Sequence, residues 1–63
     1  MTPDRLRRHL DVLGWSSTAL AERLGVSPVT VRRWLTGTRL VPQNVADKIE
    51  AVTAAVLRLS DRD

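Results

Sequence analysis

Apolar residues along the chain form four short groups with helical spacing, and turn-forming residues separate the groups. Proline is favoured in the first turn of a helix and glycine just past its end. The prolines and glycines lie where this rule puts helix ends: Pro3, Gly14, Gly25, Pro28, Gly37 and Pro42. The pattern therefore predicts an all-α fold, a single domain over residues 1–63, with helices at about 3–13, 17–24, 28–36 and 43–59.

The second and third of these helices are predicted to form a tightly connected pair. Ser16 and Ser27 are the expected N-caps, because a serine hydroxyl accepts a hydrogen bond from a backbone N–H of the first turn. Trp15 is expected to pack on Leu20 as a hydrophobic staple. Since the turn at Gly25 is very short, the two helices cannot lie comfortably antiparallel. We expect them to cross steeply, as in a helix-turn-helix.

The first helix is predicted to bury one face. Thr2 precedes it, and Asp4 is well placed for the positive end of the helix dipole. Its leucines are spaced four and three residues apart, which predicts a single buried stripe formed by Leu6, Leu10 and Leu13. His9 lies off this stripe on the polar side, so we expect it at the surface.

The fourth helix is expected to carry a longer apolar stripe. Its start is predicted either at Asn44 or at the Val41–Pro42 step, and the sequence leaves both alternatives open. A break near Thr53 also stays open. The stripe repeats at intervals of four and three residues and consists of Val45, Ile49, Val52, Val56 and Leu59.

The third helix is predicted to bury one face and to expose two adjacent arginines. Successive helix residues are rotated by about 100°, so Val31, Trp34 and Leu35 point inward together. The opposite side then carries Val29, Arg33 and Thr36, with Thr30 and Arg32 flanking them. Such a face suits the major groove of DNA, where Arg pairs with guanine and apolar groups meet thymine methyls.

Composition narrows the range of functions. The chain has no Cys and a single His, which excludes disulfides and Cys or His metal clusters. We therefore expect no metal and no cofactor. Ten Lys and Arg residues stand against seven acids, and residues 1–41 hold seven arginines but three acids. Because Arg suits bidentate contact with phosphate or guanine, this imbalance indicates a nucleic-acid partner.

Residues 17–36, STALAERLGVSPVTVRRWLT, resemble the helix-turn-helix of the Cro/CI-type family. That family includes phage repressors, plasmid and toxin–antitoxin regulators, and the xenobiotic-response-element regulators of bacteria. The matching positions are a small residue between the two helices, a turn glycine and two apolar residues of the second helix: Ala21, Gly25, Val31 and Trp34. The similarity extends over residues 13–42. It implies a small four- to five-helix bundle of the lambda-repressor-like type, with the last two helices fused or reduced into 43–59.

The resemblance also implies roles for individual residues. Helix 28–36 corresponds to the recognition helix, which enters the major groove of double-stranded DNA by its N-terminal half. The residues placed nearest the bases are Pro28, Val29, Thr30, Arg32 and Arg33. The residues that match phosphate contacts are Ser16, Ser17, Thr18, Ser27, Thr36, Thr38 and Arg39.

The chain departs from the family pattern at the start of this helix. Many members carry Gln or another hydrogen-bonding residue where this chain has Pro28 and Val29, and neither of these side chains makes a directional bond to a base. Base recognition is therefore expected to depend on Arg33, with Thr30 and Arg32 in support. This predicts a guanine at the Arg33 position and a thymine methyl nearby.

The end of the fourth helix is a candidate dimer interface. Family members usually read palindromic sites as dimers. Val45 and Ile49 are expected in the core, whereas apolar residues farther along would be exposed in a monomer. Packing of the whole stripe on the first helix is the alternative. The candidate interface residues are Val52, Val56, Leu57 and Leu59.

The leading interpretation is a regulator that binds specific DNA sequences and has no enzymatic activity. It would act as a homodimeric repressor on an inverted-repeat operator, and activation stays open. Two other interpretations are an antitoxin or adaptor that binds proteins through helix 43–59, and a DNA-bending accessory factor for recombination. No small-molecule ligand is expected. The charged N-terminal stretch and the lack of Cys predict a cytoplasmic protein without a signal peptide or a membrane span.

Overall fold

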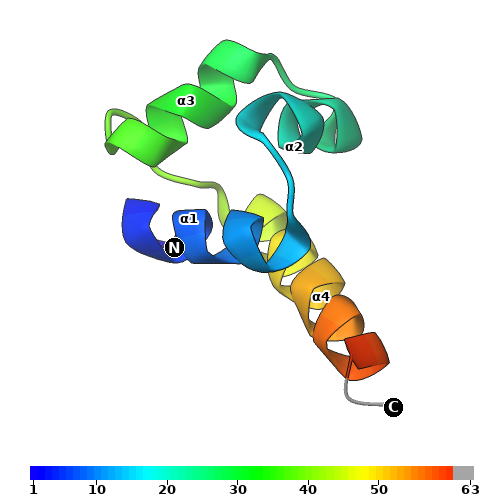
Figure 1. Ribbon diagram of the computed structural model, residues 1–63. Helices are drawn as coiled ribbons and strands as arrows, with labels where there is room; N and C mark the ends of the chain where they lie inside the picture. Colours follow the sequence, from blue (N-terminus) through cyan, green and yellow to red (C-terminus); the bar gives the residue numbers. More distant parts are fainter. Residues whose placement is uncertain (61–63) are drawn as a thin grey trace.

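The computed structural model describes residues 1–60, and every regular element in that range is an α-helix. The helices are α1 (Pro3–Leu13), α2 (Ser17–Leu24), α3 (Pro28–Thr36) and α4 (Gln43–Ser60). The predicted all-α class is confirmed, and the helix bounds differ from prediction by one residue, at the end of α4. α1 contacts both α3 and α4, and α2 packs on α3 (Figure 1).

Local hydrogen bonds define the ends of the short helices. The Ser16 hydroxyl accepts a hydrogen bond from the Ala19 N–H at 3.1 Å, and the Ser27 hydroxyl accepts one from the Thr30 N–H at 3.3 Å. Both serines are therefore N-caps, as predicted. Gly25 ends α2 in a left-handed conformation with φ of 71°, which costs a residue with a side chain about 1–2 kcal/mol. This glycine reverses the chain between α2 and α3.

The start of α4 lies at the Val41–Pro42 step. The Pro42 carbonyl accepts hydrogen bonds from the N–H groups of Val45 at 3.1 Å and Ala46 at 2.9 Å. Asn44 therefore lies within the first turn, and of the two predicted starts the proline step is the correct one. The helix continues through Thr53 without a break.

The core draws side chains from all four helices and from the loop before α4. Ala21 of α2 is fully buried, and it is the small residue that the Cro/CI-type resemblance places between α2 and α3. Trp34 of α3 is also buried, so it packs in the core. The complete set of buried apolar residues is Leu6, Leu10, Leu20, Ala21, Val31, Trp34, Val41, Ala46 and Ile49.

α4 buries a face that is rotated from the predicted stripe. Its buried side chains are Ala46, Ile49 and Thr53, whereas Val52 is 40% exposed and Val45 is half-buried. The prediction counted only large apolar residues, and it therefore missed one small and one polar residue that face α1 and the core. As a result, an apolar edge of α4 that includes Val52 lies outside the core.

The surface position predicted for His9 is wrong. His9 is half-buried, and its Nδ1 lies 2.8 Å from the Thr53 hydroxyl. That hydroxyl donates to the Ile49 carbonyl oxygen at 2.8 Å, so its oxygen is left to accept a hydrogen bond from the Nδ1–H of His9. The polar side of α1 is covered because α4 crosses it, and the hydroxyl of Thr53 satisfies the polar groups at this crossing.

We expect Thr53→Val to lower the free energy of unfolding by about 1 kcal/mol. The substitution keeps the shape of the side chain but removes the hydroxyl that bonds both His9 and Ile49. Urea denaturation followed by circular dichroism measures the change. Thr18→Val is the matched control, because Thr18 is exposed and the structure gives its side chain no hydrogen bond. Equal stability of the two variants would contradict a role for the His9–Thr53 bond.

Candidate nucleic-acid interface

The side of α3 opposite the core is an exposed face, which we call the α3 face. Val31 is fully buried and Trp34 is 3% exposed, so the side chains on the other side of the helix point outward, as predicted. Val29 is 45% exposed and presents methyl groups there. The exposed residues of the α3 face are Pro28, Val29, Arg32, Arg33 and Thr36. A helix with one free side fits the major groove of DNA.

Three arginines on or beside the α3 face have no carboxylate partner within residues 1–60: Arg32, Arg33 and Arg39. The ion pair in this range joins the Arg7 guanidinium to the Asp4 carboxylate, with 3.7 Å between Nη1 and Oδ1. A guanidinium without an internal partner keeps its donors free for phosphate or for a guanine edge. The positive charge on this side of the protein is therefore not neutralised by neighbouring side chains.

The hydroxyl groups at the N-termini of α2 and α3 are already engaged in local bonds. The Ser27 and Thr30 hydroxyl oxygens lie 2.9 Å apart. Thr30 is half-buried, so its side chain lies at the first turn rather than at the centre of the α3 face. At α2, Ser17 is half-buried and Thr18 is exposed. The backbone N–H groups at both termini point toward the space where an anion is favoured.

The loop after α3 is held by hydrogen bonds to the end of that helix. The Thr36 hydroxyl donates to the Arg33 carbonyl at 3.2 Å and lies 3.0 Å from the Thr38 hydroxyl. The Arg39 N–H also donates to the Arg33 carbonyl, at 3.2 Å. The Arg39 side chain is exposed. A phosphate bound by either threonine would therefore replace an internal bond, whereas the Arg39 guanidinium is free to bind directly.

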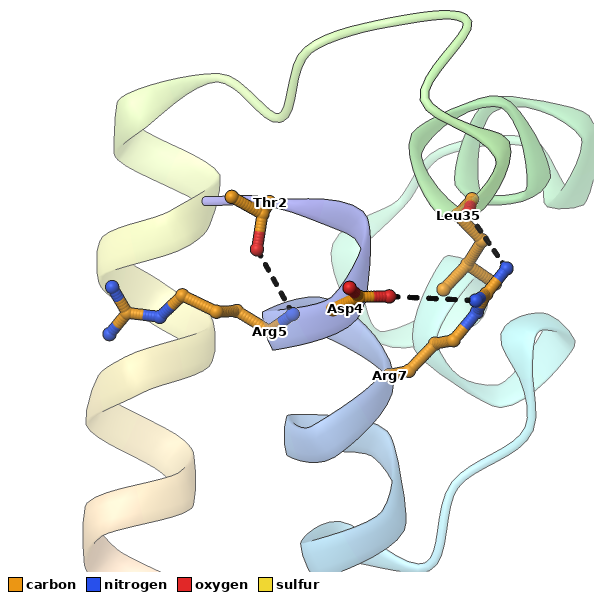
Figure 2. A network of polar contacts seen from close by, with 5 residues as sticks. All are labelled: Thr2, Asp4, Arg5, Arg7 and Leu35. Carbon is orange, nitrogen blue, oxygen red and sulfur yellow. Dashed lines mark hydrogen bonds and ion pairs between the residues drawn. The ribbon is translucent and has the colours of Figure 1, made fainter.

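Arg7 is a residue of this region that sequence reasoning missed. Its Nη2 donates to the Leu35 carbonyl oxygen in the last turn of α3 at 3.1 Å. Figure 2 shows the guanidinium reaching from α1 to this carbonyl beside Asp4, while Arg5 points the other way, toward α4. A cation at this end of a helix also interacts favourably with the helix dipole. Arg7 therefore ties the end of α3 to α1, and no local motif signals a bond between residues so far apart.

The four residues predicted for a dimer interface do not lie on one side of α4. Val52 lines a groove together with Trp15 and residues of α2. Leu57 instead lies near Val12 and other residues of α1, on the opposite flank of α4. Leu59 is two residues beyond Leu57, a rotation of about 200°, which returns it to the flank of Val52. Val56 is half-buried between the two flanks.

Within residues 1–60, no helix has the length and apolar character needed to cross a membrane. In the same range, no cluster of three or more His, Cys, Asp or Glu side chains is arranged to hold a metal ion. Asp47 and Glu50 are both exposed on α4, and the Asp47 carboxylate accepts a hydrogen bond from the Gln43 side chain at 2.9 Å.

Comparison with known families supports a helix-turn-helix motif formed by α2 and α3. The helix-turn-helix family matches residues 6–54, which cover most of α1, all of α2 and α3, and most of α4. The chain belongs to the helix-turn-helix family. This family binds DNA, and the match agrees with the Cro/CI-type resemblance without selecting a subtype. No curated protein and no solved structure shows significant similarity to the chain.

In this helix-turn-helix protein we expect Arg7→Ala to loosen the end of α3. Loss of the bond to the Leu35 carbonyl should speed hydrogen exchange at the Gly37 and Arg39 amides, which close the last turn and the loop. The loss of stability should be at most about 1 kcal/mol, because the bond is solvent-exposed. Hydrogen exchange followed by NMR measures the effect.

Arg8→Ala is the control for this change. It removes the same charge from α1, and the structure gives the Arg8 side chain no bond to α3. If hydrogen exchange at the Gly37 and Arg39 amides were equally fast in the two variants, the bond from Arg7 to the Leu35 carbonyl would not be what stabilises the end of α3.

Proposed function

We propose that the protein is a transcriptional regulator that binds a specific DNA sequence, with α3 in the major groove. Membership of the helix-turn-helix family supports DNA binding. The observation that carries the finer proposal is the α3 face, where Arg33 stands outward without an internal carboxylate partner and Val29 presents methyl groups beside it. The other proposed base contacts are Pro28, Thr30 and Arg32.

Arg33 is the residue that we propose reads a base directly. A guanidinium donates two parallel hydrogen bonds to the O6 and N7 acceptors of guanine, and few other side chains match this geometry. Val29 offers only apolar contact, which suits the methyl group of thymine. Thr30 is held by Ser27 at the first turn, so we assign it a supporting contact at the edge of the site.

Phosphate contacts are proposed on both sides of the α3 face. Arg39 is the strongest candidate, since its side chain is exposed and its backbone is fixed by the bond to the Arg33 carbonyl. Contacts from the N-terminus of α2 would add backbone N–H donors. The remaining proposed phosphate contacts are Ser16, Ser17, Thr18, Ser27, Thr36 and Thr38.

We further propose that the protein acts as a homodimer on an inverted repeat and represses transcription by occupying a promoter, in the cytoplasm. A single helix contacts few base pairs, so two half-sites about one helical turn apart would raise specificity. Apolar surface left exposed on α4 supports a partner. An antitoxin or adaptor role through the same helix is the second candidate, and copurification of a different protein would favour it.

Selection from random double-stranded DNA, followed by sequencing of the bound sites, tests the proposal. We expect an inverted repeat with half-sites about ten base pairs apart and a guanine in each. Enrichment of no sequence, with binding that only depends on salt, would contradict a sequence-specific regulator.

Arg33→Ala is expected to lower affinity for the selected site by about 1–3 kcal/mol and to relax the preference for guanine. The cause is the loss of the paired hydrogen bonds to the base. Fluorescence anisotropy with the selected site and a scrambled site measures both effects. Arg58→Ala, which removes an exposed arginine from α4, is the control and should bind both sites as the natural chain does. Normal discrimination by Arg33→Ala would show that another residue reads the guanine.

Arg39→Ala is expected to act differently, because a phosphate contact carries no sequence information. Affinity should fall by a similar factor for the selected and scrambled sites. The slope of log affinity against log salt should also become shallower by about one unit per protomer. A loss confined to the selected site would place Arg39 at a base instead.

A further inference from the structure

An open groove lies between α2 and α4. Its volume is about 450 Å³, and sites that hold small molecules commonly have about 300–1,000 Å³. Aliphatic side chains of both helices form its floor: Leu20, Leu24, Ile49, Ala51 and Val52. The groove therefore offers an apolar surface of the size that a small ligand covers.

The charged residues of this groove are both cationic. Arg23 of α2 and Lys48 of α4 line it, and no Asp or Glu of residues 1–60 does. Both side chains are exposed, and neither has a carboxylate partner in the part of the chain that the structure describes. The acidic neighbours of Lys48 along α4, Asp47 and Glu50, lie outside the lining. An apolar floor between two unpaired cations is complementary to an anion that carries an apolar body.

The Arg23 guanidinium is held at the groove by Trp15. Its Cζ lies 4.4 Å from the centre of the indole ring, which is a cation–π contact. This contact uses none of the hydrogen-bond donors of the guanidinium, and within residues 1–60 the structure gives them no acceptor. Because the side chain is already positioned, little of its conformational freedom is lost when an anion binds.

The groove is short along both helices. Its lining runs from Leu20 to Leu24 on α2 and from Lys48 to Val52 on α4, and four residue steps of an α-helix rise about 6 Å. One aromatic ring or a short aliphatic chain fills this length. A long acyl chain or a helix of another protein would extend beyond it, so the size favours a compact ligand.

We propose that the α2–α4 groove binds a small aromatic or short-chain aliphatic carboxylate. The apolar body of the ligand lies on the floor of the groove, and its carboxylate accepts hydrogen bonds from Arg23 and Lys48. A carboxylate has two acceptor oxygens, so one group bridges the two cations. The bound ligand thereby joins α2 to α4.

This site lies apart from the proposed DNA contacts, because none of its lining residues is among them. The inference therefore does not rest on DNA recognition, and every titration that tests it is done without DNA. The sequence predicted no small-molecule ligand, since Arg23 and Lys48 are far apart along the chain. Only the packing of the helices brings the two cations to one groove.

NMR titration of the whole chain with 3-phenylpropanoate tests the proposal. The chain has two tryptophans, of which Trp15 lines the groove and Trp34 is buried in the core. The indole N–H signal of Trp15, assigned with Trp15→Phe, should shift with a dissociation constant of about 1 mM or lower. The Trp34 signal should stay in place. No shift at Trp15 up to about 10 mM ligand, or a shift of equal size at Trp34, would overturn the proposal.

The neutral analogue 3-phenylpropan-1-ol separates the contribution of charge from that of apolar contact. It keeps the ring and the chain but lacks the carboxylate, so it should bind about tenfold more weakly. Equal affinity for the alcohol and the carboxylate would show that the cations do not bind the ligand, and would overturn the assignment.

The double variant Arg23→Gln/Lys48→Gln should lower the affinity for 3-phenylpropanoate about tenfold, because it removes two exposed ion pairs of modest strength. Arg8→Gln/Arg58→Gln is the matched control. It removes the same net charge from exposed residues that do not line the groove, and it should bind as the natural chain does. Circular dichroism checks that both variants fold. Equal losses in the two variants would reduce the effect to net charge and contradict a site in the groove.

A series of straight-chain carboxylates from butanoate to decanoate tests the size of the ligand. Affinity should rise about fourfold for each added methylene group while the chain is covered by the groove. It should level off at about six carbons, because a longer chain extends past the floor of about 6 Å into water. A steady rise through decanoate would mean that the apolar surface continues beyond the groove, and it would overturn the compact ligand.

Discussion

Burial of Val31 and Trp34 is the interaction on which the rest of the structure depends. With both side chains in the core, α3 has no freedom to rotate about its axis. The angle between the inner and outer side chains is a property of the helix itself, so Arg33 and Val29 must face away from the protein. A core contact thereby determines which side chains of α3 are exposed to solvent.

The helices around α3 enclose a small core, and local and long-range hydrogen bonds stabilise their arrangement in addition to it. A chain of 63 residues buries a smaller share of its surface than a larger domain does. Serine caps begin α2 and α3, and a left-handed glycine ends each of them. Arg7 then joins the end of α3 to α1. These bonds hold the two motif helices at a defined orientation with a core of few residues.

α4 is buried along part of its length and carries exposed apolar residues along the rest. Its first half supplies Ala46 and Ile49 to the core, and Thr53 satisfies the polar crossing with α1. Beyond that crossing Val56 is half-buried, and Leu57 and Leu59 are exposed on different flanks of the helix.

The sequence by itself determined the bounds of α1, α2 and α3, the two serine caps, the burial of Val31 and Trp34, and the outward face of α3. These features arise from residues within one or two helical turns of each other, so local propensity and periodicity are enough to predict them. The His9–Thr53 bond joins residues 44 positions apart, and the Arg7–Leu35 bond joins residues 28 positions apart. Such contacts, like the flanks on which Leu57 and Leu59 lie, depend on how the helices cross, and the crossing is set by the packing of the whole core.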